Sequence, residues 1–248
     1  MLNPVQPGRL EQQLAFLREI DRLKTVVRQS PLLDKSRKEN SAEHSWHLAM
    51  YALVLSEYAS GAVDTTRVMQ MLLLHDIVEI DVGDVPIHGT IGHDIQAAKE
   101  SEAAARLFGL LPAPQGEIFL ALWREFEHAQ TDDARFAKAL DRFQPLLINV
   151  FTQGGTWTES GVSLEQVFAG YGPAIQRGAP QLWAVCEEWV TRHFAALGTG
   201  DVNLRDDAEP GTPGTGQAPC PVCNGSGKIE QTRCATCGGS GNVLRRPR

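Results

Sequence analysis

Apolar side chains recur every three or four residues over most of the first 197 residues, which is the period of amphipathic helices that pack on a core. Later helical patterns cover residues 94–109, 115–129, 133–151 and 180–197. The first stripe covers residues 9–27 and consists of Leu10, Leu14, Leu17, Ile20, Leu23 and Val27. No strand-like alternation is evident, and residues 29–40 predict a connecting loop. The pattern therefore predicts an all-α fold, a compact helical bundle.

Two further helices are indicated by their expected caps. Asn40 is a favourable N-cap, and Glu43 three residues later can complete a capping box, so a helix is expected from this point to about residue 59. Asp64 is expected to cap the next helix, whose apolar run ends at the dipeptide of His75 and Asp76.

The composition changes at Gly198. Residues 198–218 are polar and rich in Gly, Pro and Asp, and they have too little apolar surface to pack. They predict a flexible linker between a domain at 1–197 and a small segment at 219–248.

The charge and the apolar runs exclude some classes of protein. The formal net charge is -7 and no basic stripe is visible, which argues against nucleic acid as the main partner. The chain has no apolar run of about 18 residues and no secretory signal, so we expect neither a membrane span nor secretion. A cytoplasmic protein is the expectation.

Two histidines and two aspartates are candidate metal ligands. Hydrolytic metal sites use imidazole and carboxylate ligands and keep a position for water. His75 and Asp76 are adjacent, and since neighbouring helical residues point about 100° apart, both can reach an ion only at a helix end or between helices. His44 and Asp141 are the best candidates for the other ligands. A carboxylate within the apolar pattern FAKALDRFQPLLINVF is costly to bury without a cation or strong hydrogen bonds.

Several motifs together resemble the HD-domain phosphohydrolase superfamily. They are ENSAEHS with His44, LLLHD with His75 and Asp76, VEIDVGDVP, and KALD with Asp141. The resemblance covers about residues 9–197 and is to the branch that contains bacterial 5'-deoxynucleotidases and their eukaryotic relatives. It implies an all-helical HD domain in which these histidines and aspartates hold one divalent ion, for which Mn, Co, Mg and Zn are all suitable.

The same resemblance implies catalytic roles for Glu79 and Asp84 in VEIDVGDVP. A water bound to the ion would be hydroxide-like near neutral pH. The two carboxyl groups could orient that water, take its proton or protonate the leaving ribose oxygen, and which of them is the acid is left open. The alternative for both is a surface acid, which is also the expectation for Asp81.

Binding of a phosphate also needs positive charge. Arg37, seven residues before His44, and Lys138, one helical turn before Asp141, match basic residues of relatives and are candidate substrate ligands. The alternative for each is a solvated surface charge.

Arg28 is a third candidate substrate ligand, although it is one position out of register. The bacterial deoxynucleotidases carry Arg-Trp before the proline that matches Pro31, whereas this chain has Gln29 and Ser30. The resemblance places that pair near the sugar and phosphate. The preference for deoxyribose, and for monophosphates, is therefore left open.

The remaining histidines have simpler interpretations. His47 is expected to pack within its helix or to support a ligand, and His128 is expected either beside the site or in solvent. His88 and His93 could support a second metal, but their spacing does not match the dinuclear branches clearly.

The C-terminal segment predicts a small zinc-binding hairpin. It contains the internal repeat CxxCxGxG, which resembles the zinc repeats of J-domain cochaperones. Two CxxC pairs are typical of a four-thiolate structural zinc site with no open position, whereas reversible thiols or disulfides are the alternative. A basic tail follows, and the segment could bind a protein or nucleic acid. The predicted ligands are Cys220, Cys223, Cys234 and Cys237.

These features favour a metal-dependent phosphohydrolase that acts on nucleoside 5'-monophosphates, including deoxy ones. A hydrolase of triphosphates or of another small phosphoester is an alternative with the same chemistry. A non-catalytic helical adaptor, with the zinc segment as its binding element, is the third alternative. A homodimer is expected by family analogy alone.

Overall fold

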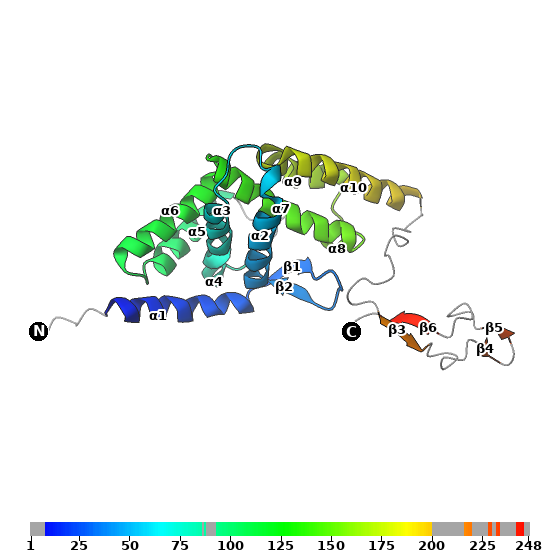
Figure 1. Ribbon diagram of the computed structural model, residues 1–248, viewed down its shortest axis with the longest axis horizontal. Helices are drawn as coiled ribbons and strands as arrows, with labels where there is room; N and C mark the ends of the chain where they lie inside the picture. The colour runs from blue at the N-terminus through cyan, green and yellow to red at the C-terminus, as the bar shows by residue number, and fades with distance from the viewer. Residues whose placement is uncertain are drawn as a thin grey trace, which may run out of the picture. The chain divides into compact units, whose positions relative to one another are not determined.

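The computed structural model describes residues 8–85, 87 and 93–199, together with four short strands at 216–219, 228–229, 232–233 and 242–245 (Figure 1). The chain divides into two units, Met1–Gly200 and Asp201–Arg248. The first unit is helical, which confirms the predicted fold class. No helix within the described ranges has the length and apolar character that crossing a bilayer would require.

The elements of the first unit are helices, short 3-10 turns and one pair of strands. They are α1 Arg9–Ile20, η1 Asp21–Thr25, β1 Val27–Pro31, β2 Lys38–Asn40, α2 Ser41–Leu55, η2 Ser56–Tyr58, α3 Thr65–Leu74, η3 His75–Val78, α4 Glu79–Val82, α5 His93–Phe108, α6 Ala113–His128, α7 Asp132–Phe151, α8 Gly155–Ser160, α9 Leu164–Gly178 and α10 Pro180–Thr199.

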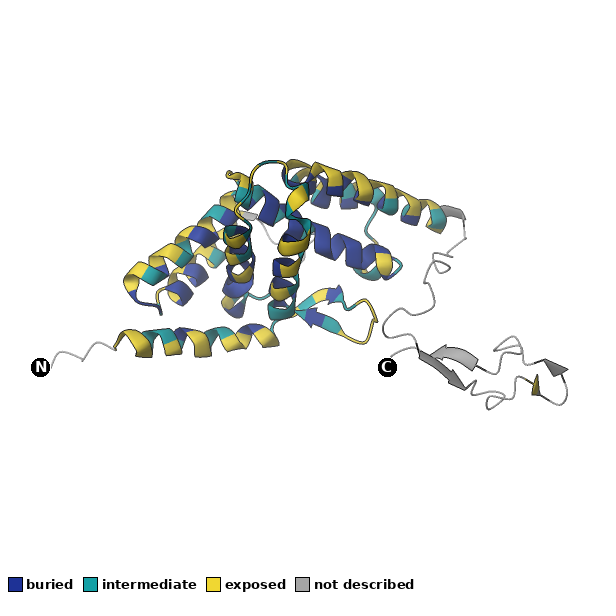
Figure 2. Ribbon diagram, viewed as in Figure 1, coloured by how far each residue is buried: buried dark blue, intermediate teal, exposed yellow. Residues whose placement is uncertain are grey.

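Helix α7 is the centre of this unit. It packs against α2, α3, α6, α9 and α10, and 14 of its 20 residues are buried, as its dark blue course in Figure 2 shows. Because α7 is enclosed, its polar residues Asp141 and Gln144 lie in the core, at 6% and 0% exposure. Groups of this kind need partners, since an unpaired buried polar atom is costly.

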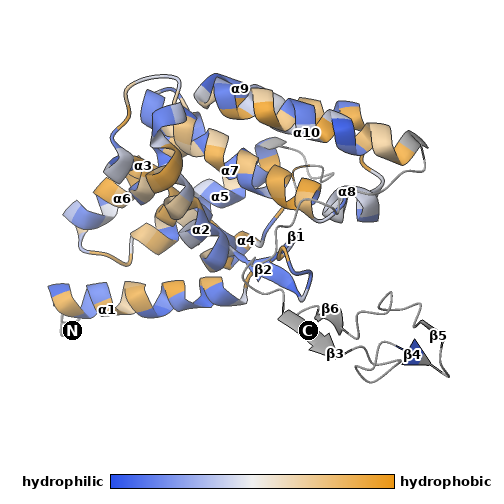
Figure 3. Ribbon diagram, turned by 45° about the vertical axis from the view of Figure 1, so that its right-hand side comes forward, coloured by the Kyte–Doolittle hydropathy of each residue, from blue (hydrophilic) through white to orange (hydrophobic). Residues whose placement is uncertain are grey.

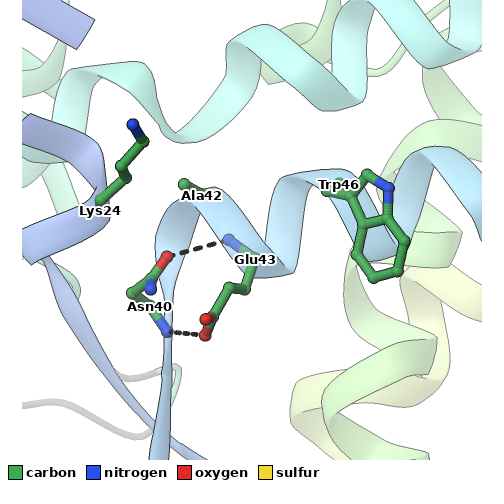
Figure 4. A pocket seen from close by; sticks show the side chains of 5 residues that line it. All are labelled: Lys24, Asn40, Ala42, Glu43 and Trp46. Carbon is green, nitrogen blue, oxygen red and sulfur yellow. Dashed lines mark hydrogen bonds between the residues drawn. The ribbon is translucent and has the colours of Figure 1, made fainter. Parts of the chain in front are cut away.

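The predicted caps of α2 and α3 are confirmed. The Asn40 side chain accepts from the Glu43 amide at 3.0 Å, and the Glu43 carboxylate accepts from the Asn40 amide at 3.1 Å (Figure 4). Asp64 accepts from the Thr66 and Arg67 amides at 2.9 and 3.2 Å. The caps determine where α2 and α3 begin, and therefore the positions of the side chains that follow.

The loop prediction for residues 29–40 was wrong in part. β1 and β2 form an antiparallel hairpin in which Val27 lies opposite Asn40 and Pro31 lies opposite Lys38. Strands of five and three residues are too short for a clear alternation of apolar and polar side chains. Their backbone pairing is therefore what identifies them. The hairpin places Arg28 and Glu39 next to the start of α2.

The prediction of one apolar stripe over residues 9–27 was also wrong. It was wrong in where the helix ends and in which face of α1 is buried. Helix α1 ends at Ile20, and Leu10, Leu14 and Leu17 are 66%, 55% and 58% exposed. The helix instead buries Phe16, whose ring lies 6.4 Å from that of Phe108 on α5. Figure 3 shows the apolar residues distributed along α1.

Helix α9 was missed by the sequence prediction. Its sequence LEQVFAGYGPAIQRG contains three glycines and an internal Pro173, all of which have low helix propensity. Tertiary packing explains the glycines, because a Cβ on Gly178 would lie 2.1 Å from the Arg135 carbonyl oxygen of α7. Helix α9 therefore forms because it packs closely on α7.

The residues of the second unit that the structure describes form two antiparallel strand pairs. β3 (Gly216–Pro219) pairs with β6 (Asn242–Arg245), and β4 (Lys228–Ile229) pairs with β5 (Thr232–Arg233). The predicted zinc ligands Cys220, Cys223, Cys234 and Cys237 lie outside the described residues.

Candidate metal centre and active site

Three helical segments meet at the predicted metal centre. His44 lies in the first turn of α2, His75 and Asp76 begin η3 at the end of α3, and Asp141 lies midway along α7. Helices α2, α3 and α7 pack against one another (Figure 1). The His75–Asp76 dipeptide therefore lies at the end of α3, beside the helices that carry the other two predicted ligands.

The ligand atoms of these residues are close enough to share one ion. His44 Nε2 lies 3.2 Å from Asp141 Oδ1 and 4.0 Å from Asp76 Oδ2. His75 Nε2 lies 2.9 Å from Asp76 Oδ1 and 3.5 Å from Asp141 Oδ1. One ligand atom from each of His44, His75 and Asp141 lies within 4.8 Å of the others, which suits a single divalent ion, and Asp76 adjoins this group beside His75.

The other nitrogen of each histidine ring is held by a buried acceptor. His75 Nδ1 lies 2.8 Å from the Leu72 carbonyl oxygen, and His44 Nδ1 lies 3.1 Å from Gln144 Oε1. Gln144 Nε2 donates to Glu39 at 3.2 Å, so the Gln144 oxygen is the atom that faces His44. Nε2 is therefore the nitrogen of each ring that faces the centre, and it could bind an ion once it carries no proton.

The electrostatics of the cluster favour an added positive charge. Burial opposes the charged imidazolium of His75, but Asp76 and Asp141 outweigh it and raise the pKa of His75 to about 10. Burial alone would raise the pKa of Asp76, yet His75 and Arg28 lower it to about 2. His75 Nε2 is buried and faces the carboxylate oxygens of Asp76 and Asp141, at 2.9 and 3.5 Å. A divalent cation would satisfy the two carboxylates and this nitrogen together.

Glu79 and Asp84 lie next to the centre. Glu79 begins α4, and Asp84 follows Gly83, whose φ of +75° ends α4 in a conformation that favours glycine. Burial first, and then the charge of Asp76, raises the pKa of Glu79 to about 9, and burial also raises the pKa of Asp84. The Ser41 hydroxyl donates to Glu79 at 2.5 Å.

Arg28 on β1 connects these carboxyl groups. Its Nη1 lies 3.1 Å from Asp76, 3.2 Å from Asp84 and 3.8 Å from Glu79, and its Nε lies 3.3 Å from Glu39. Burial disfavours its charge, but Asp76, Asp84 and Glu79 outweigh this effect and raise the pKa of Arg28. Arg28 is therefore a permanent cation beside the predicted catalytic acids.

The comparisons with known proteins agree with this geometry. A family model described as HD domain matches residues 20–183. The chain belongs to the HD-domain family. A crystal structure of a "predicted metal-dependent phosphohydrolase" from Magnetospirillum magnetotacticum MS-1 is 51% identical to this HD-domain chain, with a TM-score of 0.70, and the match covers 75% of this chain and 96% of that one.

More distant HD-domain relatives are also similar. The human 5'-deoxynucleotidase HDDC2 is 29% identical over 135 residues, which is 54% of this chain and 65% of the human protein. The match thus spans less than two thirds of that relative's length. The HD domain-containing protein YGK1 is 16% identical with a TM-score of 0.51, covering 78% of this chain and 90% of that chain, and shows likeness of fold alone.

The other two predicted phosphate ligands lie in different surroundings. Arg37 is 54% exposed in its side chain and makes a two-pronged ion pair with Glu43 at 2.7 and 2.8 Å. Lys138 pairs with Glu127 at 3.1 Å and lies over the Phe126 ring at 4.1 Å. Neither makes an ion pair with a predicted metal ligand within the described residues.

The remaining histidines and Asp81 of this HD domain also lie in different surroundings from one another. His47 Nδ1 lies 3.5 Å from Gln144 Nε2, and His128 is exposed at the end of α6. Asp81 pairs with Arg106 at 2.6 Å on the surface. His88 and the side chain of His93 lie outside the described residues.

A cavity of about 360 Å³ lies elsewhere on the unit. It is lined by Lys24, Asn40, Ala42, Glu43 and Trp46 (Figure 4). None of the predicted metal ligands or catalytic acids lines it.

Sequence reasoning missed three residues that the fold places at the centre. Gln144 and Glu39 are buried and form the hydrogen-bonded support of His44. Arg142 follows Asp141, and its Nη1 lies 3.5 Å from the Asp141 Oδ2. A signal for Gln144 was present, because it is polar within the same apolar run that drew attention to Asp141. Glu39 lies in the quoted motif ENSAEHS but carried no distinguishing pattern.

Proposed function

We propose that this HD-domain chain is a metal-dependent phosphohydrolase that removes phosphate from nucleoside 5'-monophosphates, deoxy ones included. The observation that carries the proposal is that ligand atoms of His44, His75 and Asp141 lie within 4.8 Å of one another, with Asp76 Oδ1 2.9 Å from His75 Nε2. The names of the relatives, 5'-deoxynucleotidase and metal-dependent phosphohydrolase, support the substrate class and the reaction type.

The two histidines and two aspartates would hold one divalent ion. When bound, such an ion polarises a phosphoryl oxygen and lowers the pKa of a coordinated water. The identity of the ion among Mn, Co, Mg and Zn is not determined by this ligand set.

Glu79 and Asp84 differ in their suitability for proton transfer. Without a bound ion, burial and then Asp76 raise the pKa of Glu79 to about 9, which favours the protonated form of its carboxyl group. A protonated carboxyl group can donate to the leaving ribose oxygen, so Glu79 is the better general acid. Asp84, held 3.2 Å from Arg28, would orient the attacking water and accept its proton.

The proposed substrate contacts include Arg28, Arg37 and Lys138. Arg28 is best placed of the three, because it already lies within 4 Å of Asp76, Glu79 and Asp84. Its guanidinium could align the transferred phosphate with the two acids.

A phosphate-release screen tests the proposal. The full chain, with its metal content measured, is assayed against ribo- and deoxyribonucleoside 5'-monophosphates, the matching triphosphates and a simple aryl phosphate. Release from monophosphates that is lost in Asp76→Ala supports the proposal. Release from triphosphates alone supports the second enzyme alternative, and no release from any substrate by the metal-loaded chain favours the adaptor.

A structural zinc in the C-terminal unit is a separate part of the proposal. The spacing of the four cysteines supports it, and the segments that contain them join the paired strands β3–β6 and β4–β5. Zinc content that falls by one per chain in Cys220→Ser, with the HD-site metal retained, would support this site. The cytoplasmic location, the homodimer and a partner for the tail stay predictions.

A further inference from the structure

The two carboxylate oxygens of Asp141 face different groups. Oδ1 lies 3.2 Å from His44 Nε2 and 3.5 Å from His75 Nε2, so it faces the predicted ion. Oδ2 lies 3.5 Å from Nη1 of Arg142. Adjacent residues of a helix point about 100° apart, so the Arg142 side chain has to turn back toward the centre to make this contact.

Four basic residues lie near the site or are predicted to bind phosphate. Of these, Arg142 is the one least neutralised by neighbouring groups. Arg28 has four carboxylates within 4 Å, Arg37 is held in a two-pronged pair, and Lys138 has both an acidic and an aromatic partner. Among the described residues, Arg142 has one ionic contact and donates no hydrogen bond. Most of its five N–H donors are therefore available to an incoming anion, and their planar fork matches phosphate oxygens.

The exposure of Arg142 places it on the solvent side of the centre. Its side chain is 32% exposed, whereas that of Asp141 is 9% exposed and that of His44 is buried completely. Both Arg142 and Arg28 act on the buried hydroxyl of Tyr171, where their charges oppose the rise in its pKa that burial causes. The guanidinium of Arg142 therefore reaches the centre from α7 through Asp141, and that of Arg28 reaches it from β1 through Asp76.

The negative charge of the centre favours a further cation for the binding of phosphate. Five carboxyl groups lie around it, and they outnumber Arg28 and a divalent ion even if Glu79 is protonated. A phosphate monoester is itself nearly a dianion at neutral pH. Without another positive group, its approach would be opposed by the same carboxylates that hold the ion. These residues are Glu39, Asp76, Glu79, Asp84 and Asp141.

We infer that Arg142 is a substrate-binding residue that holds the non-bridging oxygens of the phosphoryl group. The inference rests on the proposed function, which it deepens by adding a cation that binds the phosphate alongside Arg28. The ligand class is a phosphate monoester or its product, inorganic phosphate. The contact is one of binding and charge, and Arg142 takes part in no proton transfer.

The test measures phosphate binding and turnover separately from metal binding. Full-length wild type, Arg142→Gln and Arg142→Lys are loaded with Mn²⁺, and the affinity for inorganic phosphate is measured by calorimetry together with the KM for a nucleoside monophosphate. Loss of a charge-assisted contact predicts a rise of about tenfold or more in both constants for Arg142→Gln. Arg142→Lys, which keeps the charge but not the fork, is expected to fall between the two.

Arg135→Gln is the matched control. Arg135 lies on the same helix and is also 32% exposed, but it pairs with Asp132 rather than with a metal ligand. Its phosphate affinity is expected within about twofold of wild type. The affinity for Mn²⁺ without phosphate is expected to change little in the Arg142 variants and in Arg135→Gln, since neither arginine is a predicted metal ligand.

Two results would overturn the inference. One is an unchanged phosphate affinity in Arg142→Gln. The other is a loss of Mn²⁺ affinity as large as the loss of phosphate affinity, which would mean that Arg142 acts only through Asp141.

The proposed function can fail separately from this inference. A wild type that releases phosphate from no nucleotide, yet binds phosphate in an Arg142-dependent way, would leave the inference standing for another phosphoester.

Discussion

His44 and Asp141 are separated by 97 positions in the sequence, yet His44 Nε2 lies 3.2 Å from Asp141 Oδ1. Both side chains are buried, one from the first turn of α2 and the other from the middle of α7. A carboxylate and an imidazole at this distance can either share a proton or bind a cation together. The arrangement of His75 and Asp76 around the same point favours the cation.

Asp141→Asn is expected to abolish binding of the divalent ion. An amide keeps the shape of the side chain but removes the charge that offsets the cation, and turnover should fall with it. Metal content per chain, measured after desalting, checks the result. Asp132→Asn is the control, because that aspartate lies on the same helix and is exposed. Equal metal content in wild type and Asp141→Asn would contradict the ligand assignment.

Gln144→Met is expected to weaken metal binding without removing a ligand. The change keeps the volume of the side chain but removes the acceptor for His44 Nδ1, so the ring loses its fixed orientation. We expect the affinity for Mn²⁺ to fall by roughly 10- to 100-fold, measured by calorimetry. Gln144→Glu keeps an acceptor for His44 and should lose less, although it places a second carboxylate beside Glu39. An affinity unchanged in Gln144→Met would show that His44 needs no such support.

Glu79→Gln is expected to lower kcat by about 10²- to 10⁴-fold while the metal stays bound, because an amide cannot transfer a proton. Asp84→Asn should also lower kcat. Rates and metal content measured on the same preparations separate proton transfer from ion binding. Asp81→Asn is the control, since Asp81 lies on α4 with Glu79 but pairs with Arg106 on the surface. Full activity in Glu79→Gln would remove that residue from the mechanism.

Cys186 is expected to be unreactive in the folded chain. It is buried completely, and burial raises the pKa of its thiol to about 12. At pH 8 the thiol is neutral in the fold, so iodoacetamide should label it only after denaturation. Because the pKa is higher in the folded chain, this group's contribution to stability is present below the ordinary thiol pKa and declines as the pH rises above it. Peptide mass spectrometry locates the label, and modification of Cys186 in the native chain would contradict its burial.

The pattern and caps of the sequence were sufficient for much of the fold. The helix starts at Asn40 and Asp64 depend on hydrogen bonds to amides two or three residues away, and such local bonds can be inferred from the order of residues alone. Asp141 could be named because buried charge in an apolar pattern is unusual, and the full set with His44, His75 and Asp76 could be named because these residues lie in motifs that resemble the HD family. Their convergence could be hypothesised but not measured.

The sequence by itself determined an all-helical unit, the positions of its main caps and the chemical character of a metal-binding set, because these follow from spacing and from the cost of burying charge. Only the tertiary structure decided that α9 is a helix, that β1 and β2 pair, and that Gln144, Glu39 and Arg142 lie at the centre. Each of these depends on contacts between segments far apart in the chain, and no local pattern specifies which side chains meet when helices pack.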